Sequence, residues 1–273
     1  MTSATATPAQ RERPALKLGV SVLIAASGVL LFGFAMPLAG YPVLAAALVA
    51  AWFVDRRMFR DLSLIAVGLV ALSLVPINTS IDWSHMLQMG AALAVAVLTP
   101  YLLSRFVFRD HAIRFPVATG HRWTKLEWGY LIVVIGLGYA ILPVYLIRSG
   151  IYQNWPAATT GDEVFRLFLG TNALGIWDEL FFICTCFALL RRHLPDWQAN
   201  LIQAALFTSF LWELGFRSFG PFIIFPFALV QGWTFTLTKS LSYIVTVHLL
   251  FDFVLFLVLL HSHNPSILQF FVY

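Results

Sequence analysis

The sequence predicts an all-α, polytopic membrane protein, and three observations support this. Sixty per cent of the 273 residues are hydrophobic and only 11% are charged, whereas soluble domains carry about 25% charged residues. Apolar runs long enough to cross roughly 30 Å of hydrocarbon recur along the chain. Basic residues gather in alternate polar breaks between those runs. We therefore attribute the net charge of +4 to inter-helix loops and expect no nucleic-acid partner.

The apolar runs indicate nine transmembrane helices. The predicted spans are 18–38, 41–54, 62–78, 86–104, 128–147, 165–190, 198–216, 221–237 and 240–261. The second is short, and the break Gly40-Tyr41-Pro42 before it is compatible with a tight hairpin. The first run is longer than the core of a signal peptide, which favours an anchor, with a cleaved signal as the alternative.

Polar breaks divide the chain into parts. We expect a disordered cytoplasmic N-terminus over 1–17, transmembrane helices over 18–147, an external loop over 148–164, a four-helix core over 165–262 and a tail over 263–273.

The basic residues also predict an orientation. With the N-terminus inside, 14 of the 17 lysines and arginines fall on inner segments, and only Arg148, Arg166 and Arg217 are external. Because cytoplasmic loops are enriched in Lys and Arg, we expect an inner N-terminus and an outer C-terminus. The membrane is expected to be a bacterial plasma membrane, with the basic loop 105–127 against anionic lipid.

Four carboxylates and one histidine stand out because they lie inside apolar runs: Asp178, Glu179, Glu213, His248 and Asp252. A charged side chain at mid-bilayer costs roughly 3 kcal/mol, so such groups persist where they pair, bind an ion or take part in chemistry. Nothing comparable is evident in the first 160 residues. The sequence therefore predicts the functional site in the C-terminal half.

Asp178 and Glu179 are adjacent, and two neighbouring carboxylates in low dielectric cannot both be ionised cheaply. A proton-bearing acid beside a base suits acid/base work on water, proton transport or cation binding, and a structural hydrogen-bonded pair is the alternative. Glu213 stands four residues before Arg217, which allows either a boundary ion pair or an inward-facing carboxylate.

His248 and Asp252 are also four residues apart and share a helix face. A carboxylate one turn from an imidazole can fix its tautomer and leave the other nitrogen free to react. His with carboxylates on converging helices could also bind a divalent cation such as zinc. No compact metal motif is present, so the cofactor stays unassigned. Cys184 and Cys186 point about 200° apart on a helix and are interpreted as packing residues.

These residues, in this order, resemble the CPBP family of intramembrane proteases, which includes type II CAAX prenyl endopeptidases and bacteriocin-processing or immunity proteins. The resemblance covers about 165–256. Its best stretch, PFIIFPFALVQGWTFTLTKSLSYIVTVHLLFD, is similar to the family's phenylalanine-rich helix, glycine, short basic turn and H-x-x-x-N/D motif. The first family motif is E-E-x-x-x-R and the second ends in His.

The resemblance implies a role for each matching residue. Asp178 and Glu179 fill the glutamate pair, which with the second-motif His activates a water. His248 and Asp252 fill the third motif, which stabilises the oxyanion. Two positions depart from the pattern. Ile183 stands at the position of the first-motif Arg. Glu213 stands at the second-motif His, or Leu214 if the alignment shifts by one residue.

We therefore expect an intramembrane endopeptidase that cleaves near the cytoplasmic membrane face with a carboxylate-activated water. Its substrate would be a membrane-embedded or lipidated peptide or protein. Because two family residues are replaced, a non-catalytic binding or immunity protein of the same fold is the main alternative. A proton- or cation-coupled transporter is a third reading, disfavoured by the lack of inverted repeats in the sequence. The oligomeric state is not assigned.

Overall fold

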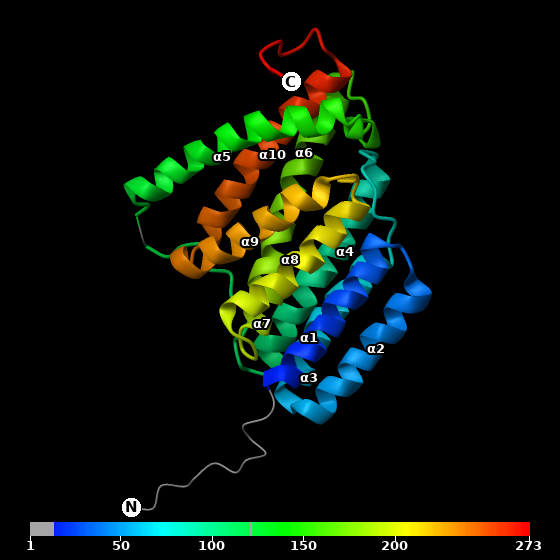
Figure 1. Cartoon of the computed structure of the whole chain (residues 1–273), viewed down its shortest axis with the longest axis vertical. Helices are drawn as coiled ribbons and strands as arrows, with labels where there is room; N and C mark the ends of the chain where they lie inside the picture. The colour runs from blue at the N-terminus through cyan, green and yellow to red at the C-terminus, as the bar shows by residue number, and fades with distance from the viewer. Residues whose placement is uncertain (1–13, 121) are drawn as a thin grey trace, which may run out of the picture.

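The computed structural model describes residues 14–120 and 122–273, and this part of the chain is helical without strands (Figure 1). Most of the N-terminal tail expected over 1–17 lies outside the described residues. Residues 14–17 belong to the first helix. The prediction of an all-α membrane protein is confirmed.

Each of the nine predicted spans corresponds to one long helix within the described residues. The helices are α1 (Pro14–Gly28, continued to Gly33), α2 (Pro37–Val54), α3 (Arg56–Ser73), α4 (Trp83–Leu102, continued to Val107), α5 (Lys125–Pro143, continued to Arg148), α6 (Gly161–Asp178, continued through α7, Ala188–Leu190), α8 (Asp196–Glu213), α9 (Gly220–Thr238) and α10 (Leu241–His263). Seven are long and apolar enough to cross a membrane. α3 and α8 are more polar, because α3 opens on RRMFRD and α8 on DWQAN.

The break between α1 and α2 lies earlier than expected. The chain turns at residues 34–36, where Ala35 has a φ of 50°, and α2 begins at Pro37, a position that suits proline in the first helical turn. Gly40 and Pro42 lie inside α2. Gly40 is there for close packing, because a Cβ at that position would overlap Leu31. The predicted hairpin exists, but its residues were misplaced.

Several helices begin with side chains that satisfy free backbone amides. Thr124 and Thr160 each form a capping box, with the glutamate three residues later, at the starts of α5 and α6. Asp55 caps α3 by accepting from the amide of Arg57 at 2.8 Å. Ser240 caps α10.

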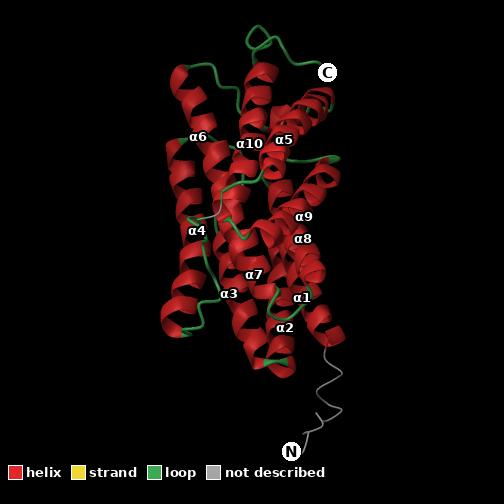
Figure 2. Cartoon of the chain, turned by 90° about the vertical axis from the view of Figure 1, so that its left-hand side faces the viewer, coloured by secondary structure: helices red, strands yellow, loops and turns green. Residues whose placement is uncertain are grey.

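Successive helices run in opposite directions, so the loops alternate between the two ends of the molecule (Figures 1 and 2). One end, here the basic face, holds the start of α1, the α2–α3 turn and residues 191–195, and the start of α5 and the α9–α10 turn lie toward it on one flank of the molecule, at mid-height in Figure 1. The other end, here the loop face, holds residues 74–82, 149–160, 214–219 and the C-terminus. The pattern agrees with the predicted alternation of basic segments, and which face is cytoplasmic stays a prediction.

The C-terminal helices form one body with the N-terminal ones. α10 packs against α5 and α6, and α8 packs against both α9 and α1. Phe32 after α1 meets Phe210 of α8 edge to face at 5.9 Å. The hydrophobic core therefore runs continuously from α1 to α10.

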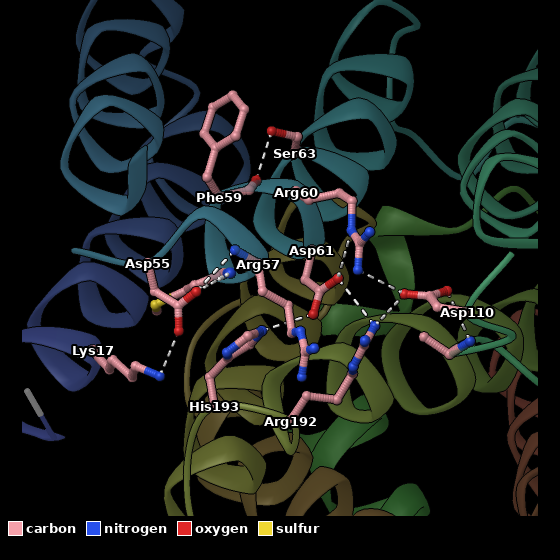
Figure 3. Close-up of polar contacts among 12 residues, drawn as sticks. Lys17, Asp55, Arg57, Phe59, Arg60, Asp61, Ser63, Asp110, Arg192 and His193 are labelled. Atoms are coloured by element: carbon pink, nitrogen blue, oxygen red, sulfur yellow. Dashed lines mark hydrogen bonds and ion pairs between the residues drawn. The ribbon is translucent and has the colours of Figure 1, made fainter. Parts of the chain in front are cut away.

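A network of charges lies at the basic face (Figure 3). Asp61 of α3 is fully buried and accepts a hydrogen bond from Arg192 at 3.1 Å, while its other oxygen lies 2.7 Å from His193 Nε2. Arg192 and Arg60 also donate to Asp110, at 2.8 and 3.1 Å. The sequence indicated no buried charge here, because Asp61 stands in the polar stretch RRMFRD. Since α3 already begins at Arg56, Asp61 is carried onto its buried side.

The same face ties down α1. Lys17 donates to Asp55 at 2.7 Å (Figure 3). Burial raises the pKa of Asp55, but hydrogen bonds from Lys17 and from two backbone amides outweigh it and lower the pKa to about 2. Burial likewise raises the pKa of Asp110, and hydrogen bonds from Ser104 and Arg192 lower it below the usual value. Both carboxylates are held in the charged form.

Candidate active site

The candidate site lies where α6, α9 and α10 meet. Glu179 and His248 are brought together by the packing of α6 on α10, with Glu179 Oε1 2.8 Å from His248 Nδ1. The same oxygen accepts a hydrogen bond from Gln231 Nε2 of α9 at 2.6 Å. All three side chains are buried. Two neighbouring helices thus fix the position of Glu179.

His248 stands between two carboxylates. Glu179 contacts its Nδ1, and Asp252 Oδ2 lies 3.7 Å from its Nε2, one helical turn along α10. A hydrogen bond donated from Nδ1 to Glu179 leaves Nε2 of a neutral ring as an acceptor, and Nε2 can donate only when both ring nitrogens are protonated. Gly175 makes this approach feasible, because a Cβ there would overlap the Asp252 carboxylate.

The helix that carries the acids changes form at the site. From Glu179 to Phe187 it is a π-helix, and Thr185 donates to the carbonyl of Leu180, five residues back, at 2.9 Å. π-helical turns occur frequently at functional sites. The wider turn buries nearly every residue of the segment, Glu179 included. Asp178, the last α-helical residue before it, is only 3% exposed.

Asp178, His248 and Asp252 line one cavity of about 170 Å³, here the chamber, between α4, α6, α8, α9 and α10. Asp178 Oδ1, Glu179 Oε2 and Asp252 Oδ2 are buried and have no hydrogen-bond partner in the protein. Buried polar groups are normally paired with protein or with water. The chamber has room for several waters at about 30 Å³ each. The unpartnered oxygens therefore mark the place where a water can bind to the acids.

The structure does not bring Glu213 to the chamber. Its carboxylate forms an ion pair with Arg217 at 3.0 Å, and the side chain is 24% exposed. Leu211 and Leu214 of the same helix end line the chamber instead. Of the two arrangements that the sequence allowed for Glu213, the boundary ion pair is the one observed.

Ile183, at the position of the family's arginine, is buried beside Asp178 and Glu179. Gln231 was missed by the sequence analysis, although it lies in the apolar stretch FALVQGWTF and donates both to Glu179 and to the carbonyl of Ile244. A polar amide in a membrane-length apolar run was the signal that could have found it. Cys184 and Cys186 are buried packing residues, as expected.

The donor set does not fit a resident metal ion. Within the described residues no three His, Cys, Asp or Glu side chains are grouped to hold one. Glu179 and Asp252 approach opposite nitrogens of His248, so they cannot share an ion with the ring. We derive no step through a metal.

A comparison with known protein families gives a match over the helices that carry the candidate site. Residues 160–254 match the family model described as type II CAAX prenyl endopeptidase Rce1-like. The match covers about a third of the chain and contains all of the acids and the histidine predicted from the sequence. The resemblance to the CPBP family is confirmed over this Rce1-like segment. No curated protein and no solved structure matches the chain.

The Rce1-like segment runs from the start of α6 to beyond Asp252 on α10. It therefore contains Glu179, His248 and Gln231, which contact one another directly. Together with the seven apolar helices, a match to a membrane protease family identifies an integral membrane protein.

Proposed function

We propose that the Rce1-like segment is an intramembrane endopeptidase, in which an acid of the chamber activates a water against a peptide bond. The observation that carries the proposal is the convergence of Asp178, His248 and Asp252 on one chamber, with Glu179 fixing the imidazole. The family name refers to prenyl endopeptidases, which supports a membrane-embedded or lipidated peptide as the substrate.

Asp178 is the proposed general base. Its Oδ1 is buried, unpartnered and at the chamber wall, within reach of a bound water. The water oxygen attacks the carbonyl carbon while its proton moves to Asp178. When the tetrahedral intermediate collapses, the carbon–nitrogen bond breaks and Asp178 returns that proton to the leaving amine. The carboxylate is regenerated and no other reactant is needed.

His248 is the proposed oxyanion donor and acts as an imidazolium, which donates from Nδ1 to Glu179 and from Nε2 to the oxyanion. Glu179 holds Nδ1, so Nε2 is directed toward Asp252 and the chamber. A donor held in place before the reaction stabilises developing negative charge without reorganisation. Asp252 assists as a protonated acid, because a carboxylate would repel the oxyanion. A neutral acid here does the work of the asparagine found in the family motif.

A second candidate is a binding protein of the same fold without catalysis. The observation that favours it is Leu214, which lines the chamber where the one-residue shift places the family's second-motif histidine. With Glu213 paired to Arg217, neither residue supplies the second base there. The enzyme must then work with Asp178 alone as its base.

The test is proteolysis by the purified protein in liposomes, with a library of membrane-embedded and prenylated peptides. The wild type should yield defined products, and Asp178→Asn should lower the rate about 100-fold or more. Asp196→Asn, which alters an exposed carboxylate paired to Arg191, is the matched control and should leave the rate unchanged. Absence of products from the wild type across the library, or full activity in Asp178→Asn, would favour the binding protein.

A further inference from the structure

The chamber extends from the acids in one direction only, toward the loop face. Its wall continues from Asp178 and His248 along α4 and α6 to Asn78 and Thr79, in the exposed α3–α4 loop. A second cavity of about 390 Å³, here the vestibule, adjoins it and contains the polar side chains of Asn154 and Arg166. Chamber and vestibule share residues of the 79–81 segment and Trp155, so the two spaces meet at this loop.

The opposite direction is closed. On the side of Asp178 that faces α8 and α9, Phe182, Phe207 and Gln231 surround a space of only about 10 Å³. That is at or below the roughly 10–15 Å³ that one water requires. Beyond it, nearer the basic face, α6 continues as buried residues, among them both cysteines. Neither the chamber nor the vestibule is lined by residues of the basic-face loops.

The width of the chamber limits what can reach the acids. A cavity of about 150 Å³ lined by apolar side chains holds a benzene molecule, so the 170 Å³ chamber takes about one large apolar side chain. A helix, with a diameter of about 10–12 Å, does not fit. His248 lies fifteen residues before the end of α10, about 22 Å from the loop face along the helix.

Two glycines keep this route wide. Gly90 of α4 and Gly170 of α6 both line the chamber. A Cβ at Gly90 would meet nothing within 4 Å, and one at Gly170 would meet only the tip of Met86 at 3.8 Å. Their Cβ positions point into open space. Unlike Gly175, which is needed for helix packing, these two can accept a side chain that narrows the route.

We propose that the substrate is an extended polypeptide tail that reaches the acids from the loop face, through the vestibule, with one large apolar side chain in the chamber. The proposal rests on the proposed endopeptidase function and adds the side of access and the form of the reacting segment. The acids lie deeper than mid-helix from the loop face, yet they are reached from that face. By the distribution of basic residues this face is external, so access differs from the cytoplasmic-side cleavage that the sequence led us to expect.

The side of access is tested by thiol labelling, which needs no catalysis. Leu174→Cys places a thiol in the chamber wall, one turn before Asp178. Asn78→Cys and Asp196→Cys report on the loop face and the basic face, respectively. In sealed vesicles of defined orientation, a small membrane-impermeant methanethiosulfonate should label Leu174→Cys from the side that labels Asn78→Cys. The wild type, whose two cysteines are buried beyond Asp178, is the background control.

Labelling of Leu174→Cys only from the Asp196→Cys side would overturn the proposal. So would labelling only by a membrane-soluble maleimide, which would indicate access from lipid, or labelling only after denaturation. Because these outcomes do not depend on turnover, failure of the access route and failure of the protease function are distinguished.

A narrowing variant gives a second measurement. Gly170→Phe in the Leu174→Cys background should slow labelling at least tenfold and leave labelling of Asn78→Cys unchanged. Gly136→Phe, at an exposed glycine of α5 whose Cβ would meet nothing within 4 Å, is the matched control and should have no effect. If Gly170→Phe labels at the unmodified rate, the route does not pass between α4 and α6.

Discussion

Two buried acid–histidine pairs each include one residue of the long α6–α7 helix or of the turn that follows it, and they differ in what surrounds them. At the basic face, His193 lies 2.7 Å from Asp61, whose other oxygen accepts from Arg192 (Figure 3). At the chamber, His248 lies 2.8 Å from Glu179, whose second oxygen has no partner. The first pair is saturated by neighbours, and the second borders a cavity with unpartnered oxygens. Burial of charge alone therefore does not distinguish the two pairs, whereas the unsatisfied polar atoms and free volume beside the second pair do.

Exchange of each histidine for glutamine should separate the pairs most clearly. His248→Gln removes the oxyanion donor and should lower proteolysis about 100-fold or more, with the fold retained. His193→Gln keeps one hydrogen bond to Asp61 and should leave turnover intact, at a cost of about 1 kcal/mol in stability. Turnover and thermal unfolding of both variants in detergent measure this. Equal losses of activity in the two would mean that the basic-face pair also serves catalysis.

Neutralising Asp61 of the first pair and Asp178, which neighbours the second pair, should change the free energy of unfolding by different amounts. Asp61→Asn leaves Arg192 and His193 without their shared carboxylate and should cost about 3 kcal/mol of unfolding free energy. Asp178→Asn removes a carboxylate that has no basic partner and should change stability by less than about 1 kcal/mol. Denaturant unfolding in mixed micelles compares them directly. A stable Asp61→Asn protein would show that the network contributes little to holding α3 against the α7–α8 turn.

The register of α8 can be tested with four substitutions at three positions near its end. Glu213→Gln and Arg217→Ala should each cost on the order of 1 kcal/mol or less, with activity retained, because the pair lies at a partly exposed boundary. Leu214→His places an imidazole in the chamber and should raise kcat/KM about tenfold by supplying a second base. Glu213→His should not. Turnover lost in Glu213→Gln would instead return Glu213 to the catalytic set.

The protonation state of Asp252 can be tested by comparing two substitutions. If it acts as a neutral donor, Asp252→Asn should keep activity within about threefold, whereas Asp252→Ala should lose about 100-fold. Steady-state kinetics on one identified peptide suffices. An Asn variant as inactive as the Ala variant would assign Asp252 a charge-dependent role.

The basic face should contribute less to stability at acid pH. Because folding lowers the pKa of Asp55 to about 2, its contribution to stability is fully present above its unfolded value near 3.8. It is lost as pH falls through the folded value. The temperature of thermal unfolding should therefore fall between about pH 4 and pH 2. Asp55→Asn should make this fall with pH less steep. An unchanged slope in the variant would assign the loss to other carboxylates, Asp110 first.

The sequence predicted the nine helices because each apolar run is long enough to form one, and packing did not need to be known. Gly40 and Pro42 were misassigned to a turn, because glycine and proline also occur inside helices: Gly40 allows close packing on Leu31, and Pro42 lies within α2. The importance of Asp178 and His248 followed from the cost of charge in lipid. Their partners did not, since the register between α6 and α10 is set by Gly175 and by a π-helical segment that no local pattern indicates.

Other features escaped because they depend on where a helix faces. Asp61 lies in a polar stretch, and it is buried because the side of α3 that carries it faces the protein interior. Glu213 could face inward or pair with Arg217, and sequence alone had no means to choose. The direction in which the chamber extends depends on bulky side chains from α8 and α9 that close one end.

The π-helical segment lies between the two acid–histidine sites, and its wide turns act as an angular spacer. Upstream, Asp178 must point toward α10, and downstream, Arg192 must point toward α3. Each residue of an α-helix advances the side-chain direction by about 100°. Winding the same nine residues from Glu179 to Phe187 as an ordinary α-helix, which has fewer residues per turn, would rotate one end relative to the other. The two sites could then no longer both meet their partners, so the winding of this short segment sets the phase between the anchor at one end of the helix and the chemistry at its middle.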